Sequence, residues 1–188
     1  MFVHAEEPTR GKIVGNLDVL YKNFEIKFQV NSALNSRTSS TWNVLQMTNG
    51  GDNSFYGNRI PAIFLTRLNY GHSWSTHNSM QTYFSLNGVV GFRKDFVIPQ
   101  RQWVDVQLTQ KKIADEYVFE YKVGNTTETL TNSEPADFNT VLAYVSSPFT
   151  NTLTSSYYGS IKIRNFRVCT TGKISNQFSN FFIGPYIV

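Results

Sequence analysis

Strict alternation of apolar and polar residues is the feature of this sequence that most restricts its fold. The segment Phe24–Val30 alternates at every position, and Trp103–Gln110 and Tyr117–Val123 repeat the pattern. Successive side chains of a β-strand point to opposite faces, so a period of two is typical of strands with one buried and one wet face. Such strands belong to antiparallel sheets. The pattern predicts a buried face made of Phe24, Ile26, Phe28, Val30, Val104, Val106, Leu108, Tyr117, Phe119, Tyr121 and Val123.

Further strand candidates, separated by turn signals, fill most of the chain. They are Lys12–Leu20, Thr41–Thr48, Ala62–Leu68, Thr82–Leu86, Phe92–Ile98, Glu128–Thr131, Thr140–Ser146 and Gly159–Val168. No amphipathic helical pattern exceeds about two turns. Short strands at this density in 188 residues predict one all-β domain, a two-sheet antiparallel sandwich of the jelly-roll type over residues 12–168. We expect residues 1–11 to form a flexible tip.

The last strand candidate changes phase along its length. Ile161 and Ile163 point to one face of a regular strand, whereas Phe166 and Val168 point to the other. One extra residue near Arg164-Asn165, forming a β-bulge, would bring both apolar pairs onto the same face.

The composition of the chain excludes several classes of function and of site. The net charge is +4, but the 17 Lys and Arg residues are scattered along the chain, whereas nucleic-acid binders gather such charge on one face. No stretch approaches the roughly 20 apolar residues that a membrane-spanning helix needs. The single cysteine, Cys169, excludes an internal disulfide and any multi-cysteine metal site. Two interpretations of Cys169 stay open: a small buried hydrophobe, or an intermolecular disulfide in a secreted protein.

Four stretches in order resemble the concanavalin A-like jelly rolls that occur as laminin G-like modules. They are "NFEIKFQV" at 23–30, "WNVLQMTNGGDNSFYGNRIPAIFL" at 42–65, "QWVDVQLTQKKIADEYVFEYKVGN" at 102–125, and "FNTVLAYVSSPF" at 138–149 followed by "GSIKIRNFRV" at 159–168. The resemblance implies an extracellular recognition module. Because this fold hosts both lectins and polysaccharide-cleaving enzymes, the function must be inferred from a site.

The residues that carbohydrate-cleaving chemistry requires do not gather in the sequence. Glycoside hydrolysis needs two carboxylates about 5 to 10 Å apart, and no strand carries two acidic residues at alternate positions in such a cluster. His4, His72 and His77 have no nucleophile motif nearby. We therefore expect a protein that is not an enzyme, with no required cofactor.

The loop at Thr48–Leu65 admits three interpretations. Asp52 and Asn53 offer oxygen ligands for Ca²⁺, although Ca²⁺ usually takes six to eight oxygens from more than one carboxylate. The second interpretation is a structural turn built by glycines and Asx residues, with Arg59 as a partly buried anchor for loop carbonyls. The third interpretation is a ligand-reading rim, because aromatic rings beside amides hold sugar rings and peptides. The predicted rim consists of Tyr56, Asn58, His72, Trp74, Tyr157 and Tyr158.

Two further segments bear on partners. Asn125-Thr126-Thr127 is an N-glycosylation sequon in a predicted hairpin turn. The end of the chain, residues 169–188, is apolar and rich in aromatics, so it needs cover from its own sandwich or from a neighbouring copy. Self-association through residues 174–188 is therefore one expectation.

Three functions follow from these observations. The leading hypothesis is a non-catalytic extracellular module that binds a glycan or a protein partner in adhesion or matrix contacts. The alternative is a self-assembling structural subunit of an extracellular filament or coat, and the third is an unrecognised carbohydrate-active enzyme.

Overall fold

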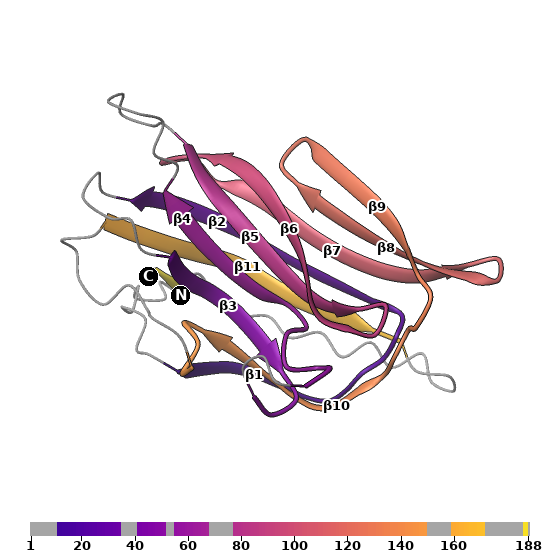
Figure 1. Cartoon of the computed structure of the whole chain (residues 1–188). Helices are drawn as coiled ribbons and strands as arrows, with labels where there is room; N and C mark the ends of the chain where they lie inside the picture. The colour runs from indigo at the N-terminus through magenta and orange to yellow at the C-terminus, as the bar shows by residue number, and fades with distance from the viewer. Residues whose placement is uncertain are drawn as a thin grey trace.

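The computed structural model describes residues 11–34, 41–51, 55–67, 77–149 and 159–171, together with the backbone of 186–187. Over these residues the chain forms two antiparallel β-sheets that pack face to face (Figure 1). The expected all-β, two-sheet antiparallel sandwich is confirmed. Within the same residues, no helix is long and apolar enough to span a bilayer.

Each sheet contains six of the described strands. The first sheet has the spatial order β1 (Lys12–Leu20), β10 (Phe138–Val145), β3 (Thr41–Thr48), β4 (Ala62–Arg67), β5 (His77–Leu86) and β6 (Val89–Pro99). The second has the order β12 (Tyr186–Ile187), β11 (Gly159–Thr170), β2 (Phe24–Leu34), β7 (Val104–Ile113), β8 (Glu116–Val123) and β9 (Thr126–Asn132). Strands β1 and β2 are consecutive in the chain but lie in different sheets, so their connection crosses from one sheet to the other.

Aromatic rings fill the centre of the space between the sheets. The ring of Phe119 in β8 lies 4.7 Å from that of Phe84 in β5 and 4.6 Å from that of Tyr121, centroid to centroid. Phe24 of β2 stacks on Phe84 at 5.5 Å, so both sheets contribute to one cluster. The residues predicted to face inward are buried, except that Tyr117 is only half-buried at the start of β8. The strand phase inferred from alternation is therefore confirmed.

Buried polar contacts explain why β5 is longer than the sequence predicted. The predicted strand began at Thr82, whereas β5 begins at His77. Asn78 is fully buried, where its side-chain amide donates to the Ser32 hydroxyl of β2 at 2.6 Å and accepts from Gln100 at 3.2 Å. Because these bonds satisfy the buried amide and join the sheets, a polar residue occupies a core position that a hydrophobicity pattern cannot detect.

The edge strands β6 and β9 are connected by an ion pair. The Lys94 ammonium of β6 pairs with the Glu128 carboxylate of β9, and both side chains are about one-third exposed. This pair joins the two sheets where each sheet ends, and charged residues on edge strands also discourage pairing with other chains.

Strand β11 contains the predicted bulge. Arg164 pairs with Gln29 and Arg167 with Lys27, so two residues of β11 lie opposite Phe28. Asn165 adopts a φ of 56°, a left-handed conformation that asparagine tolerates better than most residues. As a result Ile161, Ile163, Phe166 and Val168 are all buried.

Candidate functional site

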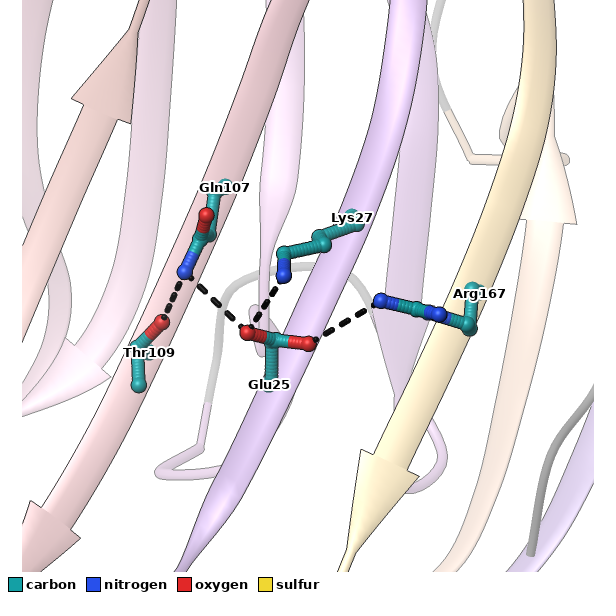
Figure 2. Close-up of polar contacts among 5 residues, drawn as sticks. All are labelled: Glu25, Lys27, Gln107, Thr109 and Arg167. Carbon is teal, nitrogen blue, oxygen red and sulfur yellow. Dashed lines mark hydrogen bonds and ion pairs between the residues drawn. The ribbon is translucent and has the colours of Figure 1, made fainter.

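The outer face of the second sheet carries the polar half of the alternation. Because Ile26 and Phe28 of β2 point into the core, Glu25, Lys27 and Gln29 point outward. The same parity directs Asp105, Gln107 and Thr109 of β7 outward. Figure 2 shows side chains from β2, β7 and β11 meeting on this face.

The strand register places cationic and amide side chains in one row across this face. Arg167 of β11 pairs with Lys27 of β2, Lys27 pairs with Gln107 of β7, and Gln107 pairs with Lys122 of β8. Thr127 of β9 continues the row. Neighbouring strands lie about 4.8 Å apart, so this "cationic row" (Arg167, Lys27, Gln107, Lys122) presents three positive charges at successive strand spacings, interrupted by one amide.

Glu25 holds part of the cationic row in position. One carboxylate oxygen lies 2.7 Å from the Lys27 ammonium and accepts from the Gln107 amide at 3.1 Å, while the other lies 3.3 Å from the Arg167 guanidinium (Figure 2). Gln107 is also 3.1 Å from the Thr109 hydroxyl. The Glu25 carboxylate accepts all three contacts and therefore orients Lys27, Gln107 and Arg167 within the row.

A second network lies next to the first, around Gln29. Its amide nitrogen donates to Asp105 at 2.7 Å, and its amide oxygen accepts from Arg164 at 2.7 Å and from Asn165 at 3.1 Å. The Arg164 guanidinium also lies 4.0 Å from the centre of the Trp103 ring. The bulge makes this arrangement possible, because it turns two consecutive side chains of β11 toward the same acceptor.

A groove of about 790 Å³ runs between these networks. Its polar lining includes Lys27, Gln29, Gln107, Lys122, Asn165 and Arg167. A smaller cleft of about 350 Å³ lies at the ends of β6 and β7, and the two hollows share Asp105, Gly124 and Asn125. The shared residues place the β8–β9 turn between the two hollows.

Charge and hydrogen-bonding capacity define what this groove can bind. Lys122 is exposed, and its side chain forms no hydrogen bond or ion pair with any other described residue. Lys27 and Arg167 share the single carboxylate of Glu25, so they retain donors for another anion. The groove therefore suits a polar ligand with hydroxyl groups and anionic substituents.

Two members of the predicted rim lie in the described part of the chain. The Tyr56 hydroxyl donates to the Glu134 carbonyl at 3.2 Å, its ring lies 5.6 Å from that of Phe138, and burial raises the pKa of the phenol. Asn58 is 4% exposed, and its carbonyl lies 3.3 Å from the Gln46 amide. His72, Trp74, Tyr157 and Tyr158 lie outside the described residues, so binding at the rim stays a prediction.

The loop around Gly57 contains several structural contacts. The Asn49 amide donates to the Gly57 carbonyl at 3.1 Å. Gly57 has a φ of 97°, and a Cβ there would lie 2.5 Å from the Asn49 side chain, so only glycine fits. Arg59 packs its guanidinium 4.7 Å from the centre of the Tyr83 ring.

The candidate cation ligands Asp52 and Asn53 lie outside the described residues. Within the described ranges, no three His, Cys, Asp or Glu side chains gather as a metal site would require. Calcium binding by this loop therefore stays a prediction.

Cys169 and Asn125 have defined positions. Cys169 is partly buried in β11 opposite Glu25 and forms no disulfide with another described residue. Asn125 is exposed in the turn between β8 and β9, as the sequence predicted for the sequon.

The residues of the cationic row escaped the sequence-based search for a site. Lys27, Gln107, Lys122 and Arg167 each occupy the polar position of an alternating strand, where a charge usually marks only a solvated face. The alternation along each strand indicated that these four residues face outward. The order and register of the strands were needed to show that they lie side by side.

Fold and groove together define an antiparallel β-sandwich with a polar, hollowed sheet face. No protein-family model matches the chain, and no curated protein matches it. Among solved structures, the heptameric SAP-like pentraxin from Limulus polyphemus is similar at 9% identity and a TM-score of 0.50, over 83% of this chain and 67% of that one. An alginate lyase from Alteromonas sp. 272 gives 5% identity and a TM-score of 0.44, over 80% and 73% of the two chains. The family 18 polysaccharide lyase aly-SJ02 is similar at 7% identity and a TM-score of 0.43, over 80% of this chain and 74% of that one.

These likenesses concern the fold alone. The pentraxin match supports the jelly-roll sandwich expected from the sequence. The narrower laminin G-like relationship stays a prediction, and the function has to be argued from the groove.

Proposed function

We propose that this chain is a non-catalytic recognition module that binds an acidic saccharide in the groove on the second sheet. The observation that carries the proposal is the cationic row, in which Arg167, Lys27 and Lys122 flank Gln107 along a groove of about 790 Å³.

The chemistry of the lining supports a saccharide. Sugar hydroxyls both donate and accept hydrogen bonds; the Gln107 amide oxygen can accept, and the Asn165 amide can both accept and donate its second hydrogen. Carboxylate or sulfate groups would bind Arg167 and Lys122, because charge-assisted hydrogen bonds are shorter and stronger than neutral ones. A ligand lying along the row would cross the strands and meet one cationic or amide side chain at each strand.

Two carboxylates bear on the choice between binding and catalysis: Asp105 lines the groove, and Glu25 contacts groove residues from outside its lining. Glu25 is held by two cations and one amide, and Asp105 by the Gln29 amide. These contacts suit both carboxylates to orienting their neighbours, which favours binding over catalysis.

We extend the proposal to an extracellular setting, which the family resemblance implied. Acidic polysaccharides are abundant outside cells, and the sequon at Asn125 lies in an exposed turn where a secreted chain would carry a glycan.

The test measures binding of heparin, polygalacturonate and neutral dextran by calorimetry, with Ca²⁺ or with a chelator. We expect the two acidic polymers to bind, to weaken as salt is raised because exposed charges are screened, and dextran not to bind. Lys122→Ala should weaken binding about tenfold, the value of one charge-assisted hydrogen bond.

The matched control is Lys111→Ala, which removes an exposed lysine of β7 outside the groove and should leave affinity unchanged. Equal binding of dextran would contradict recognition of charge. Loss of binding in Trp74→Ala, with full binding in Lys122→Ala, would place the site at the predicted rim instead. Dependence on Ca²⁺ would favour the Asp52 loop.

A further inference from the structure

The β8–β9 turn places a potential modification site at the edge of the groove. Gly124 has a φ of 56° and its amide donates to the Asp105 carbonyl at 2.8 Å, which fixes the turn against β7. Asn125 follows, is exposed, and lines both the 790 Å³ groove and the 350 Å³ cleft. Its side chain therefore lies where the two hollows meet.

The sequon around Asn125 is accessible in the folded chain. Asn125, Thr126 and Thr127 are all exposed, and Thr127 pairs with Lys122 of the cationic row. Transfer from a lipid diphosphate-linked oligosaccharide would join the Asn125 side-chain nitrogen to the anomeric carbon. The bond from that carbon to the diphosphate breaks, and the amide gives up one proton as the lipid diphosphate leaves.

A glycan at this position is tethered beside a surface that has the chemistry to bind it. The first sugars of such a glycan carry hydroxyl and acetamido groups, which Gln107 and Asp105 can bind. A short tether gives an effective concentration on the order of millimolar. At that local concentration, neutral sugars whose affinity is too low for dextran to bind from solution would still occupy the groove.

We infer that N-glycosylation of Asn125 fills the groove with the chain's own glycan and thereby blocks soluble saccharides. This inference rests on the proposed function, because it assumes that the groove binds sugars. The chain would then exist in a closed, glycosylated form and an open, unmodified form.

The experiment compares the full chain, secreted from a eukaryotic cell, with its Thr127→Val variant. That variant loses the sequon but keeps Asn125 and the shape of an exposed β-branched residue. Both proteins are treated with N-hydroxysuccinimidyl acetate, and the acetylation rate of each lysine is followed by peptide mass spectrometry. We expect a glycan on Asn125 and about tenfold slower acetylation of Lys122 and Lys27 in the glycosylated protein, as a tenfold excess of effective concentration over Kd would give. Lys111 should react equally in both proteins.

Thr131→Val is the matched control, since it makes the same change on β9 and leaves the sequon intact. Asn125→Gln provides a second unmodified form. The inference is overturned if Asn125 carries no glycan, or if it carries one and the rates at Lys122 and Lys27 do not change. The proposed function is tested separately: if the unmodified Thr127→Val protein binds neither heparin nor polygalacturonate, the proposed function itself is wrong.

Discussion

Truncation of Phe119 tests the packing of the sandwich at the point where the two sheets meet. Its side chain is fully buried, and its ring lies 4.6 Å from Tyr121, 4.7 Å from Phe84 and 6.0 Å from Phe24, centroid to centroid. Replacing a buried phenylalanine with alanine costs about 3 to 5 kcal/mol. Each aromatic pair adds about 0.5 to 1.5 kcal/mol beyond the contribution of its buried area. The loss in free energy of unfolding for Phe119→Ala should therefore lie near the upper end of the range for such a truncation, at about 5 kcal/mol.

Urea unfolding provides the measurement. With a slope of about 2 kcal/mol per molar urea, a loss of about 5 kcal/mol lowers the midpoint by about 2.5 M at an unchanged slope. Phe119→Leu keeps most of the volume and should lose less than half as much. The control is Val118→Ala on the opposite face of β8, which should cost under about 1 kcal/mol. A midpoint for Phe119→Ala within about 0.3 M of the parent would refute this account of the core.

Three further changes have distinct expected outcomes. Tyr121→Phe should raise the free energy of unfolding by about 1 kcal/mol, because the buried hydroxyl has no hydrogen-bond partner among the described residues. Burial also raises the pKa of Tyr121, and the unfolded phenol ionises near pH 10, so unfolding free energy should fall above that pH more steeply in the parent than in Tyr121→Phe. Glu25→Gln should cost at most about 1 kcal/mol in urea unfolding, since its ion pairs are partly exposed. It should strengthen heparin binding because it removes a negative charge that competes for Lys27 and Arg167; weaker binding would mean that the positioning of these two cations by Glu25 outweighs the loss of that charge. Removal of residues 174–188 should lower the melting temperature at constant size by light scattering if the tail packs on its own sandwich, and should reduce the size at constant melting temperature if it mediates assembly.

Much of the fold was predictable because burial on one face leaves a period of two in the sequence. Phe24, Ile26 and Phe28 are buried as predicted, and the phase change in β11 correctly indicated a bulge. The start of β5 was missed because Asn78 occupies a core position through hydrogen bonds that no hydrophobicity pattern records. The order of strands within each sheet was also beyond the pattern, since alternation says which face a residue takes but not which strand lies beside it.

The candidate groove was less predictable than the fold. Aromatic residues and amides in loops drew attention to a rim, of which Asn58 is buried in the structure and Tyr56 is tied to Glu134. Lys27, Lys122 and Arg167 are distant in sequence, and each looks like an ordinary solvated residue of its own strand. They become a row only through strand register, which depends on long-range pairing.

The bulge at Asn165 has a consequence for insertions and deletions in this chain. Arg164 lies opposite Gln29 and Arg167 opposite Lys27, so removal of Asn165 alone would leave Phe166 opposite Phe28 in an unbroken ladder. Ile163, Phe166 and Val168 would still alternate inward, and no pairing elsewhere in the sheet would shift. The extra residue is thus dispensable for the hydrophobic pattern of β11, while on the outer face it supplies the second donor to Gln29. A chain shorter by this one residue would keep its architecture and carry a different groove, which makes a single-codon deletion a means of altering the site independently of the fold.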